Sequence, residues 1–260
     1  MTVDFSRRRL LTGAGVTAAT LPLSGCFDAL GDRSGEVRGF MAGANALTYR
    51  VQRFLLGSDH LAREFAASEI RQPMRPNGST NPQAMDYLQQ VSTGFSGYRL
   101  TVDGLVERPL SISLDELRNR PSRTQITRHD CVEGWSCIAQ WTGTPLAHLL
   151  DEARVRPQAR YVVFSCFDVM ENSLTGPVQY YESIDLLDAR HPQTILAHAM
   201  NGETLPVANG APLRVRVERQ LGYKMARYSR AITVTDGLSG FGPGGGGYWE
   251  DRGYEWFAGI

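Results

Sequence analysis

The sequence has no net charge and no concentration of charge of one sign. Its 260 residues carry 27 lysines and arginines against 27 aspartates and glutamates. The basic residues are scattered along the chain, so the basic stripe that typifies a nucleic-acid-binding protein is missing. We therefore expect no nucleic-acid partner.

Cysteine is also scarce, and its spacing excludes two common uses. The four cysteines are Cys26, Cys131, Cys137 and Cys166. No two of them form a CxxC pair, which disfavours a structural zinc site. No cysteine begins a CxxCH motif, so the sequence carries no signature of covalent haem attachment.

The N-terminus resembles an export signal. Arg7 and Arg8 lie in Ser-Arg-Arg-Arg-Leu-Leu and precede a weakly apolar run over residues 12–23, which is too short and too rich in small residues to span a membrane. The arginine pair resembles a twin-arginine signal, and Leu-Ser-Gly-Cys26 resembles a lipobox. We expect residues 1–25 to be removed and Cys26 to be lipidated, which would anchor the protein in the periplasm or on the outer face of the cell membrane. The alternatives are a modest basic helix and a coincidental cysteine.

The rest of the chain has the pattern of one mixed domain. Residues 26–43 are small and polar and predict a linker, and residues 44–260 predict the folded domain. Apolar residues recur at helical spacing over 47–65, and Ser113 with Glu116 forms a capping box. Short strands are predicted at 98–106, 125–129, 161–164, 195–200, 213–217 and 231–235. Many short strands with a few short helices favour an α+β fold with mixed β-sheets.

Cys131 lies where the chemistry is concentrated, directly after a predicted strand and next to His129, Asp130 and Glu133. From these residues alone, three interpretations stay open. Cys131 can be a buried structural cysteine, a nucleophile with His129 as its base, or a thiolate ligand of a transition metal. Without further context, the structural interpretation leads.

The wider context resembles a known family. Cys131-Val-Glu-Gly-Trp-Ser, followed by Trp141-Thr-Gly-Thr-Pro-Leu, resembles the cofactor-binding core of the sulfite-oxidase superfamily. The resemblance is closest to the bacterial branch that includes the periplasmic protein-methionine-sulfoxide reductase catalytic subunits. It continues, in order, in motifs that begin at Asp103, Tyr180, His191, Asn209 and Leu221.

This resemblance implies the sulfite-oxidase molybdopterin-binding fold and a molybdenum centre held by a pterin dithiolene, with tungsten as an open alternative. Cys131 matches the position of the protein's sulfur ligand to the metal. The resemblance also implies a membrane haem protein or a quinol-linked protein as electron donor. Because the sulfite oxidases continue into a dimerisation domain that we do not find before Ile260, we expect a monomer.

The resemblance also implies roles for other residues of this sequence, one position at a time. Tyr180 matches a tyrosine that faces the metal centre, and Tyr181 would take its place if the register is shifted by one. Asn77 matches an element that touches the pterin. Asn209 stands where relatives usually carry histidine, which puts its specific contact in doubt. Arg214 and Lys224 would clamp the pterin phosphate, although each could also be a solvated surface charge.

Glu133 bears on the substrate. Relatives that oxidise sulfite carry arginines just after the metal cysteine, where this chain has Val132, Glu133 and Gly134. A carboxylate repels an anion in a desolvated pocket, so we expect oxygen-atom transfer on a neutral sulfoxide, small or protein-bound. Sulfite oxidation, another oxo-transfer or hydroxylation reaction, a thiol hydrolase and a non-catalytic envelope lipoprotein remain as alternatives.

The stretch Gly242-Pro-Gly-Gly-Gly-Gly247 lacks the spacing and the following helix of a nucleotide-binding loop. We expect instead a mobile loop leading into aromatic residues, some of which rim the active-site pocket.

Overall fold

The structure, a computed structural model, describes residues 36–174 and 176–260. The predicted twin-arginine pair and Cys26 lie outside the described residues. The chain divides into residues 1–47 and 48–260. Within the described ranges, no helix combines the length and the apolar character that crossing a membrane requires.

The first described element differs from its predicted bounds. Helix α3 runs from Glu36 to Leu56, so residues 36–43 are helical although the sequence predicts a linker there. Gly39 and Gly43 lower helix propensity by about 1 kcal/mol each relative to alanine, and they mask the periodicity. The helix also stops earlier than predicted, because Gly57 takes the left-handed conformation (φ 63°).

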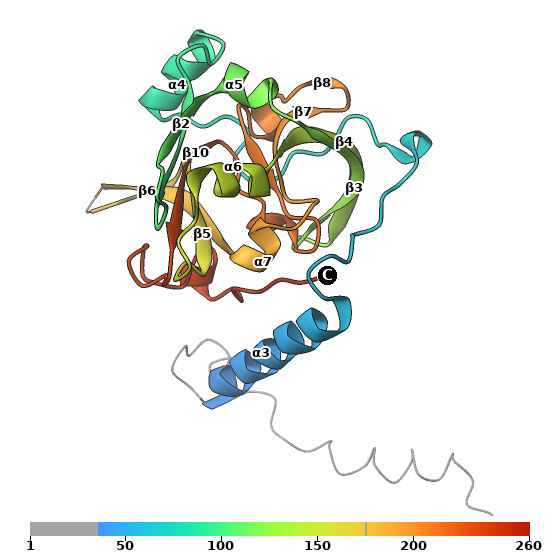
Figure 1. Ribbon diagram of the computed structural model, residues 1–260, viewed down its shortest axis with the longest axis vertical. Helices are drawn as coiled ribbons and strands as arrows, with labels where there is room; N and C mark the ends of the chain where they lie inside the picture. Colours follow the sequence, from blue (N-terminus) through green and yellow to red (C-terminus); the bar gives the residue numbers. More distant parts are fainter. Residues whose placement is uncertain (1–35, 175) are drawn as a thin grey trace, which may run out of the picture. The chain divides into compact units, whose positions relative to one another are not determined.

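Residues 48–260 contain two five-stranded sheets (Figure 1). The first has the order β2-β1-β10-β5-β6. Its strands are β1 (Arg99–Gly104), β2 (Leu110–Ser113), β5 (Tyr161–Ser173), β6 (Gly176–Asp185) and β10 (Ser229–Thr235). The β1–β10 pair is parallel and the others are antiparallel.

The second sheet has the order β3-β4-β7-β8, with β9 paired to β7. Its strands are β3 (Arg123–Cys131), β4 (Trp135–Pro145), β7 (Ile195–Met200), β8 (Glu203–Thr204) and β9 (Arg214–Arg216). Short helices connect the strands: α4 (Met85–Ser92), α5 (Leu114–Arg118), α6 (Leu146–Ala153) and α7 (Leu186–Ala189), with 3₁₀ turns η1 (Ala67–Glu69), η2 (Val207–Asn209), η3 (Gly222–Lys224) and η4 (Glu250–Arg252). This architecture confirms the α+β prediction.

Local signals in the sequence account for several elements. Ser113 caps α5 through the Glu116 N–H, and the Glu116 side chain accepts the Ser113 N–H, as the capping box predicts. Asn201 and Gly202 both have positive φ, which suits the tight turn between β7 and β8. Strands β2, β4 and β6 were not predicted.

The two sheets have separate apolar clusters. The larger one packs around the first sheet and includes Leu100, Phe164 and Ile232. The smaller one centres on Trp141 and Ile195 in the second sheet. β4 and β7 approach closely at Gly143, where an added Cβ would lie 2.2 Å from the Leu196 carbonyl oxygen. The absence of a side chain there allows this pairing.

Gly143→Ala is therefore expected to lower the free energy of unfolding by about 1–3 kcal/mol, as for other overpacked positions. Urea denaturation measures the change. Gly237→Ala is the matched control, because nothing lies within 4 Å of a Cβ at that position. Equal midpoints for the two variants would contradict the close approach.

Candidate functional site

Cys131 is the last residue of β3, at the start of a three-residue loop. In the β3–β4 hairpin Cys131 pairs with Trp135, so Val132, Glu133 and Gly134 form the connection. The Gly134 N–H donates to the Cys131 carbonyl oxygen at 3.0 Å, and Gly134 has φ 83°. Three-residue hairpin loops commonly place glycine at this left-handed position. The sequence Cys-Val-Glu-Gly-Trp thus holds Cys131 and Glu133 on one rigid turn.

This turn borders a cavity of about 130 Å³. Four residues that the sequence analysis singled out line it together, although they come from distant parts of the chain: Asn77, Cys131, Glu133 and Tyr180. The rest of the wall is mostly apolar or aromatic and includes Val132, Met170, Gly222, Tyr223, Met225, Trp249 and Tyr254. The cavity therefore combines one thiol, one carboxylate and the guanidinium of Arg227 with an aromatic rim.

The Cys131 thiol is free and half-buried. Burial raises its pKa, and the carboxylate of Glu133 acts in the same direction, while the guanidinium groups of Arg75 and Arg214 oppose them. Cys137 and Cys166 are free and buried, so none of the three described cysteines forms a disulfide.

His129 does not have the geometry of a base for Cys131. Its ring is fully buried, and its Nδ1 lies 3.2 Å from Arg216 Nη1 and 3.4 Å from Met225 Sδ. Within the described ranges, its Nε2 has no hydrogen-bond partner. Burial and the nearby arginines lower the pKa of His129. This arrangement disfavours the thiol-hydrolase alternative, in which His129 would take the proton of Cys131.

Tyr180, and not Tyr181, faces the cavity. Successive side chains of a strand point to opposite faces, and both residues lie in β6. The Tyr180 hydroxyl donates to the Tyr223 carbonyl oxygen, while the Tyr181 hydroxyl bonds to Asp251 and the Phe241 carbonyl. Burial raises the pKa of Tyr180, so its phenol stays protonated.

Arg214 and Asn209 lie next to the cavity wall at Asn77. Arg214 is fully buried and donates to the Asn209 carbonyl and to Asn77 Oδ1, both at 3.2 Å. Burial, together with the like charges of Arg216 and Arg227, lowers the pKa of Arg214. In the part of the chain that the structure describes, Arg214 Nε and Asn209 Nδ2 have no hydrogen-bond partner.

Arg227 is a further residue of the cavity, which the sequence did not predict. Its Nη1 donates to the carbonyl oxygens of Asn77 and Ser79, and its side chain lines the cavity. Nor did the sequence predict Arg216, which forms a fully buried ion pair with Glu218. The only sequence signal for Arg216 is its i, i+2 spacing from Arg214, which places both on one face of a strand.

Lys224 was predicted to bind the pterin phosphate, but it forms ion pairs with two buried carboxylates. Its Nζ lies 2.5 Å from Glu182 and 2.5 Å from Glu250, and all three side chains are buried. Burial alone would lower the pKa of Lys224, but the two carboxylates raise it. Lys224 does not line the cavity.

The glycine-rich loop packs against this ion cluster. A Cβ on Gly247 would lie 2.1 Å from the Glu250 carboxylate and 2.7 Å from that of Glu182. The Gly245 N–H donates to Asp251. The glycines thus let the backbone approach two acidic side chains, which fits the rejection of a nucleotide-binding loop.

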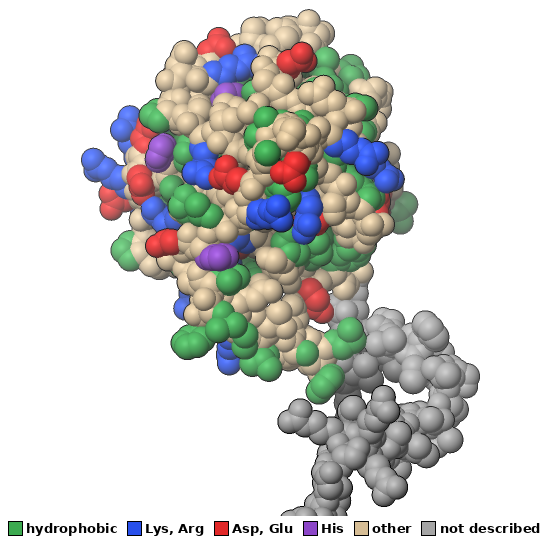
Figure 2. All heavy atoms as spheres, turned by 90° about the vertical axis from the view of Figure 1, so that its right-hand side faces the viewer, with side chains coloured by type: hydrophobic (Ala, Val, Ile, Leu, Met, Phe, Trp, Pro, Cys, Tyr) green, Lys and Arg blue, Asp and Glu red, His purple; other side chains and the backbone are tan. Residues whose placement is uncertain are grey.

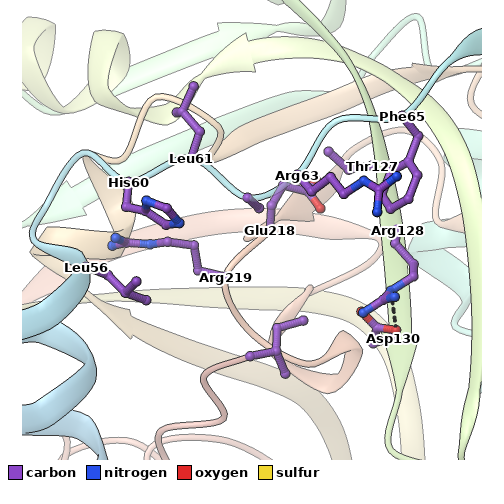
Figure 3. Close-up of a pocket in the computed structure, with 12 residues that line it drawn as sticks. Leu56, His60, Leu61, Arg63, Phe65, Thr127, Arg128, Asp130, Glu218 and Arg219 are labelled. Atoms are coloured by element: carbon purple, nitrogen blue, oxygen red, sulfur yellow. Dashed lines mark hydrogen bonds and ion pairs between the residues drawn. The ribbon is translucent and has the colours of Figure 1, made fainter.

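A larger cavity, of about 430 Å³, borders β3 at Thr127, Arg128 and Asp130 (Figure 3). Its wall includes Leu61, Phe65, Arg128 and Arg219, and none of the predicted site residues line it. On the face drawn in Figure 2, acidic and basic side chains are intermixed, which agrees with the expected lack of a basic stripe.

Known proteins similar to this chain include three subunits of sulfoxide reductases, by their names. A protein-methionine-sulfoxide reductase subunit by its name, YedZ1 of Azospira oryzae, is 38% identical over 80% of this chain and 72% of its own length. The catalytic subunits MsrP of Xanthomonas axonopodis and Ralstonia nicotianae are 39% and 37% identical, over 50% and 54% of this chain. The alignments cover only 42% and 44% of those two relatives.

Among solved structures, the sulfane dehydrogenase SoxCD from Paracoccus pantotrophus is 25% identical, with a TM-score of 0.48 over 54% of this chain and 38% of that one. A likeness of this degree supports no argument about function. The family model of the oxidoreductase molybdopterin-binding domain matches residues 88–240. Because that match covers more than half of the sequence and includes Cys131 and Tyr180, the chain belongs to the molybdopterin-binding oxidoreductases.

Proposed function

We propose that this enzyme reduces neutral sulfoxides, with the methionine sulfoxide side chain of proteins as the principal substrate. In this reaction the S–O bond breaks, and R₂SO, two electrons and two protons give R₂S and water. The observation that carries the proposal is that Cys131 and Tyr180 share one cavity with Glu133, whose carboxylate, two residues from the thiol, repels a small anion. The names of the relatives support the substrate class.

The residues around the cavity fit a pterin cofactor with a phosphate. Arg214 is buried without a carboxylate partner, and its Nε and the Asn209 amide nitrogen are donors without an acceptor in the described ranges. Buried cations and donors of this kind are stabilised by an anion that accepts their hydrogen bonds. Asn77, Asn209, Arg214 and Arg227 would hold the pterin and its phosphate.

Cys131 would hold the metal. A bound molybdenum cofactor supplies the two-electron redox chemistry, and a soft thiolate suits such a metal. Burial keeps the free thiol protonated, so binding of the metal would release that proton. The hairpin turn with Gly134 fixes the direction of the thiolate.

Tyr180 and Glu133 would act on the substrate. The Tyr180 phenol can orient the oxygen of the sulfoxide and donate a hydrogen bond to it, in exchange for its bond to the Tyr223 carbonyl. The Glu133 carboxylate accepts the Trp135 indole N–H at 2.9 Å, which holds it beside the cavity. Its charge disfavours sulfite and leaves neutral oxides unaffected.

The cell-envelope location is part of the proposal. The arginine pair at Arg7 and Arg8 and the lipobox-like cysteine Cys26 support twin-arginine export followed by lipid anchoring. Electrons would then come from a membrane haem protein or a quinol-linked protein. The subunit names of the relatives support such a partner.

The first prediction concerns the metal ligand. Cys131→Ser replaces a soft thiolate by a hard, mostly protonated hydroxyl, so sulfoxide reduction should be abolished and the molybdenum electron paramagnetic resonance signal changed. Cys137→Ala and Cys166→Ala are controls, with a packing cost of about 1 kcal/mol and near-normal activity. Activity, metal content and spectra of the three variants are compared. An unchanged signal and activity in Cys131→Ser would contradict the assignment of Cys131 as the ligand to the metal.

The second prediction concerns the sign of the substrate's charge. The enzyme should reduce a neutral sulfoxide with an artificial electron donor. With an artificial electron acceptor, it should oxidise sulfite poorly. Glu133→Gln should lower the KM for sulfite by about fivefold, equivalent to ~1 kcal/mol for one exposed charge, and leave the KM for the sulfoxide nearly unchanged. Efficient sulfite oxidation by the wild type at physiological salt would contradict the proposed repulsion of sulfite by Glu133.

The third prediction concerns export. Replacing Arg7 and Arg8 by lysine should block export, because the pathway reads the arginine pair and not its charge. Cys26→Ser should be exported but should leave the membrane fraction on washing. Cell fractionation with immunoblotting measures both. A Cys26→Ser protein that stays on washed membranes would contradict the lipid anchor.

A further inference from the structure

The mouth of the cavity is built in part by residues that follow the family domain. The matched domain ends at residue 240, whereas Trp249 and Tyr254 both line the cavity. Trp249 is half-buried and Tyr254 is 37% exposed, so both rings are accessible from the cavity or from solvent. This wall therefore comes from the segment that follows the matched domain.

The two rings are held by their neighbours. Trp249 and Tyr254 lie with ring centroids 5.3 Å apart, and Tyr254 meets Tyr223 edge-on at 5.3 Å. Tyr248 packs edge-on against Trp249 at 5.2 Å and also contacts Tyr180. An aromatic series thus connects the inner phenol of Tyr180 to the exposed ring of Tyr254.

The backbone fixes the same segment. The Tyr248 N–H donates to the Tyr181 carbonyl at 3.0 Å, and the Tyr254 N–H donates to the Trp249 carbonyl at 3.1 Å. Gly253 has φ 100°, which permits the tight turn between the two rings. Because the rings are already ordered, a ligand that packs on them loses little of its binding free energy to side-chain ordering.

The chemistry of this wall matches the alkyl chain of a sulfoxide. Met170 and Val132 complete it with apolar atoms, while the charged groups of the cavity are Glu133 and Arg227. Aromatic rings and alkyl groups both leave water when they pack together, which favours their contact. An alkyl sulfoxide has an apolar chain for the rings and a polar oxygen for the inner end of the cavity.

We propose that Trp249 and Tyr254 form a subsite that binds the alkyl chain of a methionine sulfoxide residue and so makes the enzyme prefer peptide-borne sulfoxides over small ones. This inference rests on the proposed sulfoxide reduction. The subsite contacts a part of the substrate that does not react, so it contributes equally to binding in the ground state and in the transition state. Its loss should therefore raise KM and leave kcat nearly unchanged.

The test uses the full-length, molybdenum-loaded enzyme with reduced benzyl viologen as electron donor. KM and kcat are measured for a short peptide containing methionine sulfoxide and for dimethyl sulfoxide. Trp249→Ala and Tyr254→Ala should each raise the KM for the peptide by about tenfold, roughly the change expected when two methylene groups of the alkyl chain lose their buried contact. The KM for dimethyl sulfoxide, which lacks the alkyl chain, should stay within about twofold. Trp249→Phe should restore most of the loss.

Trp256→Ala is the matched control. Trp256 belongs to the same segment, but its ring packs on Tyr49 and Tyr161 and does not line the cavity. Molybdenum content and melting temperature of all variants show whether the fold is intact. An equal rise of KM in Trp256→Ala, or equal rises for both substrates in Trp249→Ala, would mean general loosening of the segment and would overturn the subsite.

The two proposals fail in different ways. If the wild-type enzyme holds molybdenum but reduces no sulfoxide, both the proposed function and the proposed subsite are wrong. If the wild type reduces the peptide sulfoxide and the Trp249 and Tyr254 variants keep its KM, only the subsite is wrong.

Discussion

The burial of cations is the constraint on which the rest of the site depends. Arg214, Arg216 and Lys224 have no exposed surface, and a buried charge is tolerated only when other groups compensate it. Arg216 has Glu218, and Lys224 has Glu182 and Glu250. Arg214 has amide and carbonyl oxygens and the Trp141 ring, but no carboxylate partner among the described residues. The protein thus neutralises two of the three within its own chain, and the third is the one beside Asn77, where an anionic cofactor fits.

The same constraint explains features that at first look unrelated. Glu218 accepts hydrogen bonds from both Arg216 and Gln125, so a buried glutamine in β3 is part of the support for the arginine. The glycine-rich loop comes close to Glu182 and Glu250 because it has no side chains there. The glycine-rich stretch therefore packs on the buried ion cluster of Lys224, Glu182 and Glu250.

Strand alternation then selects which side chains reach the cavity. In β6, Tyr180 faces Tyr223 and the cavity, and its neighbour Tyr181 faces Asp251. At the end of β3, a three-residue turn directs Cys131 and Glu133 to the same space. Cys131 and Tyr180 thus stand on strands, while Trp249 and Tyr254 of the C-terminal segment form another part of the cavity wall. In the proposed reaction, this division would separate the chemistry from the recognition of the substrate.

The sequence by itself determined the elements with strong local signals and the identity of the central residue. Ser113 and Glu116 predict a helix start, Asn201 and Gly202 predict a hairpin, and the residues around Cys131 carry the family resemblance, because each signal lies within a few adjacent residues. Only the tertiary structure decided the bounds of α3, where glycines hide a helix, and the partners of Lys224. It also brought in Arg227, Trp249 and Tyr254, since a cavity wall is assembled from segments far apart in the chain and leaves no periodic pattern in any one of them.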